Sequence, residues 1–324
     1  MVLEALTLTW QQMAQFVPKT LLTMLLSMGM THMLIAKGFL RHLSRISQPL
    51  TARMGLPETV IAASVLAFGS ALSANAMLAE LYRKQQLSEQ EAFLGAILNG
   101  ASINVKEIFT YQLPVMLPLL GWKAGSIYLA CFSLAAVMRY AYVLVHARRA
   151  KRQRAPEQAA APAASTASAV LVAPSSSMRK QLRQFLKVAT TYVLITFGVL
   201  FVFHAGVGAW FEKMVAPISS ALQLPVAVAV PMAVFIFKPV AGASAISLLR
   251  NNGTITDIDA ALTVVVGSLL LLPLYGFRSG SIARTVSFFG PRLGFRISAT
   301  STSLAIVSRL IFLVLLMGYK LTAN

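Results

Sequence analysis

The sequence predicts an all-α polytopic membrane protein of two inverted repeats, each with about three transmembrane helices and a re-entrant helical hairpin. Three observations lead to this fold class. The chain of 324 residues is 57% hydrophobic and only 12% charged, about half the charged fraction of a typical soluble domain. Apolar windows of roughly the length needed to cross a bilayer recur along it. A low-complexity segment divides it into two halves of similar length.

The division into halves follows from composition. Residues 148–178 combine a basic cluster with alanine, proline and serine, which is typical of a disordered linker. We expect a first repeat at 1–147, a cytoplasmic linker at 148–178 and a second repeat at 179–324. The apolar windows lie at 19–38, 57–80, 90–120, 122–146, 186–210, 225–249, 257–277 and 298–319.

The halves share a pattern at a constant separation of 168 residues. Leu-Pro opens an apolar segment at 56–57 and again at 224–225, and LSEQEA at 87–92 matches ITDIDA at 255–260. Both hexapeptides begin a helix with a hydroxyl residue followed three positions later by an acid, which is the spacing of a capping box. We therefore interpret the chain as an internal repeat.

The distribution of lysine and arginine predicts the topology. If residues 57–82 and 225–249 dip into the membrane and return, every basic cluster falls in the cytoplasm and each half crosses three times, so the halves are inverted. The alternative is eight plain helices whose small residues only allow close packing. The basic clusters lie at 37–53, 83–84, 148–187 and 278–296, and the connections near 120–124, 210–224 and 250–256 carry one basic residue each.

Polar residues inside apolar segments are costly and are functional candidates. Asn75 and Asn99 could contact a ligand or bond to neighbouring helices, and Glu107 could face a cavity or reach an interface. Lys238, before Pro239, could hold an anionic group or anchor an interface. Pro114 and Pro118 predict a kink in the segment that carries Asn99 and Glu107. The full set of candidate substrate-binding residues is Ser70, Ser73, Asn75, Asn99, Ser102, Asn104, Glu107, Lys238, Ser244 and Ser268.

One stretch of the first half resembles a known family. LPETVIAASVLAFGSALSANAMLAELYRKQQLSEQEAFLGAILNG and the later LPVMLPLLG are similar to the nucleoside-recognition, or Gate-domain, membrane proteins. That group includes the spore maturation proteins A and B and the membrane part of ferrous iron transporter B. The resemblance covers about 65 residues and implies transport or gating by two Gate units, here both in one chain. It does not imply a nucleoside substrate, and the chain lacks a GTPase domain. The matching residues are Leu56-Pro57, Ser70, Ala74-Asn75, Met77-Leu78, Leu98-Asn99 and Leu113-Pro114 with Leu119-Leu120-Gly121.

These patterns favour a secondary transporter of the bacterial inner membrane that moves a small polar or anionic solute by alternating gating of the two hairpin tips. Two alternatives stay open, a lipid or lipid-phosphate translocase and a non-transporting scaffold. No enzymatic, cofactor-binding or metal-binding motif is present. The net charge of +18 lies largely in loops beside apolar segments, so we expect no nucleic-acid partner. The expected partners are a small-molecule or lipid substrate and membrane lipids, with homo-oligomerisation left open.

Overall fold

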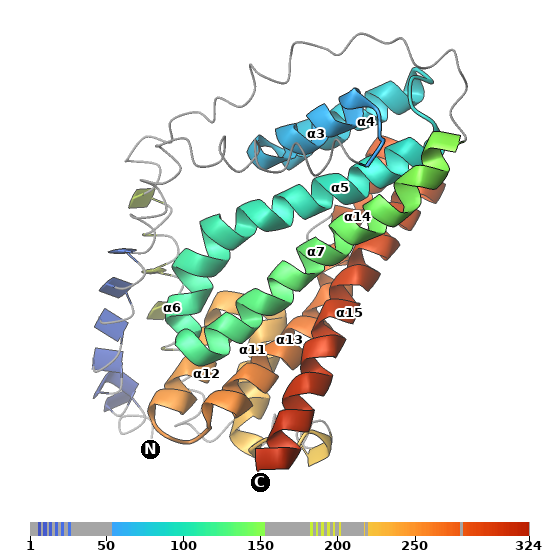
Figure 1. Ribbon diagram of the computed structural model, residues 1–324. Coiled ribbons are helices and arrows are strands. Elements are labelled where there is room, and N and C mark those ends of the chain that lie inside the picture. Colours follow the sequence, from blue (N-terminus) through green and yellow to red (C-terminus); the bar gives the residue numbers. More distant parts are fainter. Residues whose placement is uncertain are drawn as a thin grey trace.

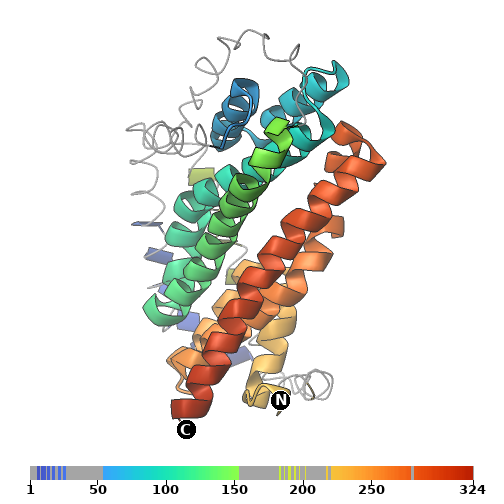
Figure 2. The same cartoon turned by 45° about the vertical axis from the view of Figure 1, so that its right-hand side comes forward.

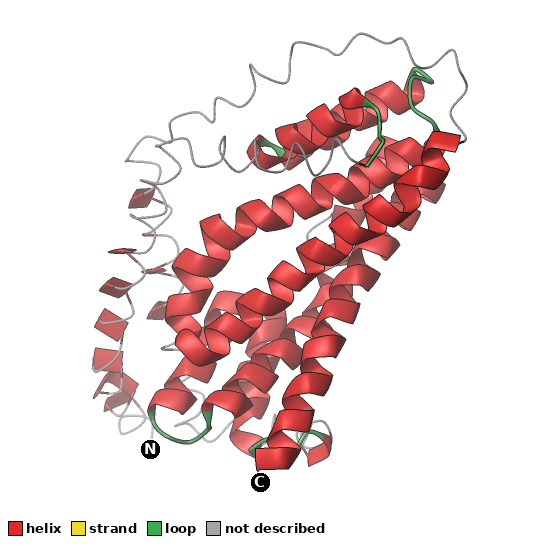
Figure 3. Cartoon of the chain, viewed as in Figure 1, coloured by secondary structure: helices red, strands yellow, loops and turns green. Residues whose placement is uncertain are grey.

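The computed structural model describes residues 54–152, 220–278 and 281–323, with scattered residues between 6 and 26, between 182 and 201 and at 217. These residues lie in helices and short turns, with no β-strand among them (Figures 1 and 3). The predicted all-α class is confirmed for this part of the chain. The apolar windows at 19–38 and 186–210 lie largely outside the described residues, as does most of the predicted linker.

The first half contains two short helices, one interrupted helix and one long helix. The predicted kink is present, because a nine-residue π-helix with Pro114 inside it separates α5 from α6. The long helix α7 continues five residues past the repeat boundary predicted at 147. The bounds are α3 (Glu58–Gly69), α4 (Ala71–Arg83), α5 (Glu89–Glu107), the π-helix η1 (Ile108–Met116), α6 (Leu117–Leu120) and α7 (Trp122–Arg152).

The second half follows a similar order. Helix α14 was not expected, because its arginine places it in a basic stretch that the sequence analysis assigned to a loop. Its apolar residues Ile282, Val286 and Phe289 nevertheless recur at helical spacing, and Phe289 is buried. The bounds are the 3₁₀-helix η3 (Val226–Val228), α11 (Ala229–Phe237), α12 (Pro239–Asn251), α13 (Asp257–Arg278), α14 (Ser281–Phe289) and α15 (Pro291–Ala323).

Two described helices are long and apolar enough to cross a membrane. The qualifying segments are Trp122–Ala147 within α7 and Pro291–Thr322 within α15. They run in opposite directions, which is visible in both views (Figures 1 and 2). By contrast, α3 has 12 residues and α11 has 9, so each is less than about 20 Å long and too short to cross the roughly 30 Å of a hydrocarbon core.

The helix bundle has two ends, which we call upper and lower as drawn in Figure 1. At the upper end, Arg296 Nη1 of α15 lies 3.4 Å from Glu89 Oε1 of α5. At the lower end, Lys123 Nζ of α7 lies 3.0 Å from Asp257 Oδ2 of α13, and Lys320 Nζ of α15 lies 2.6 Å from Asp259 Oδ1. Helices α5 and α15 therefore begin at the upper end, and α7 and α13 begin at the lower end.

The two helical hairpins start from opposite ends. Leu56 before α3 and Leu87 after α4 share an upper-end core with Ala147. Leu224 before α11 and Ile255 after α12 share a lower-end core that also contains Leu120 and Leu316. Figure 1 shows α3 and α4 near the top of the bundle and α12 near the bottom. The chain therefore enters and leaves each hairpin at the same end of the bundle.

The backbone repeats its special positions at the same separation of 168 residues that the sequence pattern has. Residues Gly55 and Gln223 both have positive φ, at 69° and 50°. The same holds for Gln85 and Gly253, at 56° and 71°.

The predicted capping boxes follow the same separation. The side chains of Ser88 and Glu91 cap α5 reciprocally. Thr256 and Asp259 do the same at α13, where Asp259 N donates to Thr256 Oγ1 over 3.1 Å and Thr256 N donates to Asp259 Oδ2 over 3.1 Å. The same local signals therefore begin the corresponding helix in each half.

Gly121 provides a test of how the halves meet. Its φ of 75° and ψ of 171° lie in a region that is almost exclusive to glycine, and an added Cβ would collide with the guanidinium of Arg250, which donates to Leu120 O. We expect Gly121→Ala to lower the free energy of unfolding by about 1–3 kcal/mol, measured by thermal unfolding in detergent. Gly318→Ala is the matched control, because nothing lies within 4 Å of its added Cβ. Equal stability of the two variants would contradict this account of the junction.

Candidate functional site

The first hairpin is interrupted at a single residue. Ser70 is extended, with φ −142° and ψ 108°, and it forms the N-cap of α4. Its Oγ accepts from Ser73 N over 3.2 Å and from Ser73 Oγ over 2.9 Å. Lys106 Nζ of α5 donates to Gly69 O, the last residue of α3, over 3.2 Å. The tip therefore presents small and polar groups beside the middle of the interrupted helix that runs from α5 to α6.

The second hairpin is interrupted at the corresponding position, 168 residues later. Lys238 has φ −143° and ψ 89°, its side chain is exposed, and Pro239 occupies the first turn of α12, where proline is tolerated. Gly242 allows the close turn-back, because an added Cβ would lie 2.3 Å from the Cα of Phe235. Within the described part of the chain, the Lys238 ammonium has no hydrogen bond or ion pair. This tip therefore carries a positive charge that faces outward.

The structure brings Asn75 and Asn99 together. Asn99 Nδ2 on α5 donates to Asn75 Oδ1 on α4 over 3.0 Å. Asn99 is fully buried, and its Oδ1 has no hydrogen-bond partner. The predicted roles for this pair were a contact to a ligand or a hydrogen bond between helices, and the hydrogen bond is present. Asn99 Oδ1 remains as an unpartnered acceptor.

The remaining predicted residues are distributed over the bundle. Ser244 donates to Val240 O over 2.7 Å and Ser268 to Val265 O over 2.8 Å, which satisfies each hydroxyl inside its own helix, as is common for buried serine. Ser102 is also buried, and Asn104 and Glu107 are half-buried on α5. In the described part of the chain, none of these side chains has a hydrogen bond to Ser70 or Lys238.

Two buried arginines are the strongest polar feature, and the sequence analysis missed them. Arg139 of α7 is 8% exposed and Arg309 of α15 is 3% exposed. Both interrupt apolar runs, AVMRYAYVLV and IVSRLIFLVL. The intramembrane-charge criterion that singled out Glu107 would have found them, but only the basic clusters beside the apolar windows were counted.

The hydrogen bonds of these arginines are incomplete. Arg139 Nη2 donates to Ser301 O over 3.1 Å, and Arg309 Nη1 donates to Ala305 O over 3.2 Å and to Ser308 Oγ over 2.9 Å. The Nε and Nη1 atoms of Arg139 and the Nε atom of Arg309 are buried without a partner. Neither guanidinium has a carboxylate within 4 Å in the described part of the chain. Such groups are normally paired when buried.

The arginines lie on either side of the crossing of α7 and α15. Arg139 contacts Ser301 of α15, and the guanidinium of Arg309 lies 5.3 Å from the ring centroid of Phe132 on α7. Midway between these contacts lie Ala135 and Ala305, both buried. Each arginine is four residues beyond the alanine of its own helix. Because the helices are antiparallel, the two contacts bracket the stretch of each helix that contains its alanine.

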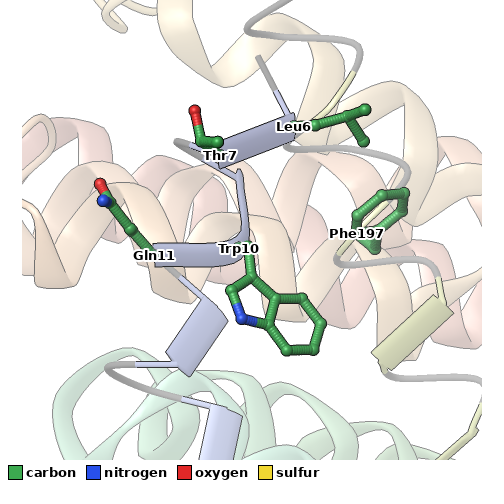
Figure 4. A pocket seen from close by; sticks show the side chains of 5 residues that line it. All are labelled: Leu6, Thr7, Trp10, Gln11 and Phe197. Atoms are coloured by element: carbon green, nitrogen blue, oxygen red, sulfur yellow. The ribbon is translucent and has the colours of Figure 1, made fainter. Parts of the chain in front are cut away.

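A pocket of about 400 Å³ lies elsewhere. Leu6 and Trp10 project toward the same space as Phe197, whereas Thr7 and Gln11 lie on the other side (Figure 4). None of the predicted site residues lines it. Among the residues that the structure describes, no three His, Cys, Asp or Glu side chains gather where they could hold a metal ion.

The described part of the chain is thus an all-helical bundle with two helices able to cross a membrane. The chain is 20% identical over 309 residues to uncharacterized protein MJ0880 of Methanocaldococcus jannaschii, covering 93% of this chain and 97% of that protein. It is 20% identical over 282 residues to uncharacterized protein MJ0871 of the same organism, covering 85% of this chain and 84% of that protein. No family model matches the chain, and no solved structure matches it significantly.

The asparagine pair yields a stability prediction. Asn75→Ala would leave the Nδ2 of fully buried Asn99 without an acceptor, so we expect it to lower the free energy of unfolding by about 1–3 kcal/mol. Adding Asn99→Ala should recover part of this loss, because both partners are then removed. Leu72→Ala is an exposed control on the same helix. Thermal unfolding of the single and double variants measures the coupling, and simple additivity would contradict a direct hydrogen bond.

Proposed function

We propose that this protein is a membrane transporter in which two inverted halves move a small polar or anionic solute past the hairpin tips at Ser70 and Lys238. The observation that carries this proposal is the pair of hairpins, which start from opposite ends of the bundle and break at equivalent residues. Interrupted helices that meet within inverted repeats are the usual architecture of substrate sites in secondary transporters. The resemblance to Gate-domain proteins supports the same reading.

The bilayer restricts where a helix can be interrupted. Non-helical backbone at membrane depth is tolerated where it is buried in protein or lines a cavity. At the first tip, Lys106 and the Ser70 hydroxyl bond to the backbone next to the break. With α7 and α15 as spanning helices, both hairpins enter the membrane without crossing it. Movement of the α3–α4 hairpin relative to α5 would then open the protein at one side of the membrane. Movement of the α11–α12 hairpin relative to α13 would open it at the other side.

The charge distribution orients the protein. The upper end of the bundle carries Arg83, Lys84, Arg284, Arg292 and Arg296, together with the basic end of α7. At the lower end, Asp257 and Asp259 pair with Lys123 and Lys320. By the positive-inside rule, the upper end is cytoplasmic.

A lipid or lipid-phosphate translocase is the second candidate. The observation that favours it is the same basic upper end, because juxtamembrane lysine and arginine attract anionic head groups. In that case the hairpin tips would admit the head group while the acyl chains stay in the bilayer.

The orientation is tested by labelling intact cells with an impermeant thiol reagent. In a Cys131→Ala background, single cysteines replace Gln85 and Arg292 at the upper end and Lys123 and Thr254 at the lower end, all exposed. Thr254 is preferred to Gly253, whose φ of 71° would strain a cysteine. We expect labelling at 123 and 254 and protection at 85 and 292 until the cells are permeabilised. Residues 85 and 292 on opposite sides would refute the re-entrant hairpin.

The tips are tested by uptake into proteoliposomes. Labelled phosphate, acetate and succinate are the probes, glycerol is the neutral control, and fluorescent phosphatidylglycerol reports lipid movement. We expect Asn75→Ala and Lys238→Ala to lower anion uptake at least about tenfold, since each removes a polar contact worth about 1.5 kcal/mol or more. The exposed Lys84→Ala variant should transport normally. Uptake by all variants at the wild-type rate would remove the tips from the mechanism, and movement of the lipid alone would favour the translocase.

A further inference from the structure

Arg139 and Arg309 lie at a depth where an unpaired charge is costly. Counted along the two apolar segments, Arg139 is within about 7 Å of the middle of its segment and Arg309 within about 4 Å, at 1.5 Å per residue. A hydrocarbon core is about 30 Å thick. Both guanidinium groups therefore lie well inside the layer, and arginine does not lose its charge in proteins.

The surroundings do not neutralise these charges. Their described hydrogen bonds go to backbone carbonyls and one serine hydroxyl. Arg139 donates to Ser301 O and Arg309 to Ala305 O, which are carbonyls about one helical turn apart on α15, so the two guanidinium groups are neighbours. Glu107 of α5 is half-buried, but no carboxylate within the described chain forms an ion pair with either arginine. Like charges inside a protein repel each other more strongly than they would in water. The pair therefore lacks an ion-paired anion.

The orphaned atoms indicate which anion fits. Three guanidinium nitrogens are left without acceptors. Guanidinium donors form a planar fork that matches the two oxygens of a carboxylate or phosphate. We propose that Arg139 and Arg309 form an intramembrane binding site for an oxyanion, a carboxylate or a phosphate group, at the crossing of α7 and α15. Its role in translocation rests on the proposed transport function, whereas the binding itself does not.

The neighbouring helix α5 lies directly against this site. Gly100 of α5 faces Arg139, and a Cβ added there would lie 3.7 Å from both Arg139 Nε and Ser301 Oγ. A longer side chain at this position would occupy the space beside Nε, which is one of the unpartnered donors. Gly100→Leu therefore blocks the site while both positive charges remain.

The binding test uses the purified full-length protein in detergent. The unfolding temperature is measured with sodium phosphate or sodium acetate, against sodium chloride of equal ionic strength and against glycerol, and affinities are obtained by calorimetric titration. We expect phosphate or acetate to raise the unfolding temperature of the wild type above the chloride value. The Arg139→Lys and Arg309→Lys variants keep the charge but lose the fork, so affinity should fall at least about tenfold. Exposed Arg292→Lys is the matched control.

A second arm identifies the source of the oxyanion. Native mass spectrometry compares phospholipid retained by the wild type, the double lysine variant and Gly100→Leu. Retention by the wild type with loss in both variants assigns the site to a lipid phosphate, and binding of free phosphate or acetate assigns it to a soluble solute. Wild-type affinity in Gly100→Leu or in the double lysine variant would overturn the site, as would the absence of any soluble or lipid oxyanion bound to the wild type.

The outcomes separate this inference from the transport proposal. Arginine-dependent binding without uptake in proteoliposomes would support the oxyanion site and refute the transport proposal. Uptake that Arg139→Lys and Arg309→Lys leave unchanged would support the transport proposal and refute a role of the oxyanion site in it.

Discussion

The packing of α7 against the second half is the contact on which the arrangement of the two halves depends, because α7 crosses α15 antiparallel and also packs on α13. Between the contacts of the two arginines lie Ala135 and Ala305, which are buried and small, as suits close helix packing. Helix α5 packs on α7, and α13 packs on α15. Each hairpin packs on the interrupted or long helix of its own half, α3 and α4 on α5, and α11 and α12 on α13. Both hairpins are therefore connected to α7, the first through α5 and the second through α13.

A second constraint is the need to satisfy backbone groups wherever a helix stops. The chain uses local means at the hairpin bases, where Ser88 with Glu91 and Thr256 with Asp259 cap α5 and α13. At the tip of the first hairpin and at Gly121 it uses long side chains from other elements, Lys106 for Gly69 O and Arg250 for Leu120 O. The basic residues at these places act on backbone carbonyls, and Arg250 in addition lies 3.9 Å from Asp257 Oδ1 through its Nε.

Much of the helical organisation could be predicted from the sequence, because it is encoded locally. The capping boxes, the breaks near residues 70 and 238 and the disturbance at Pro114 all follow from residues a few positions apart. Features that depend on long-range packing were not predictable in this way. Nothing in the sequence near Arg250 indicates that it reaches Leu120, and α14 was not predicted because it lies in a basic stretch.

The candidate site shows the same division between local and long-range features. Asn75 and Asn99 were singled out as polar residues in apolar segments, but their contact required the packing of α4 on α5. Arg139 and Arg309 met the same criterion and were overlooked, because arginines were treated as markers of topology.

The placement of Arg139 and Arg309 inside the apolar segments has a consequence for energetics. The proposed anion site supplies fixed positive charges but no source of free energy. A carrier that relied on such a site alone would equilibrate its cargo, whatever its affinities on the two sides, and could not concentrate it. Net accumulation must then come from a co-transported ion or from the membrane potential, which contributes about 2.3 kcal/mol per elementary charge for each 100 mV. An interior-negative potential drives a monovalent anion outward, so its accumulation inside requires at least one accompanying cation.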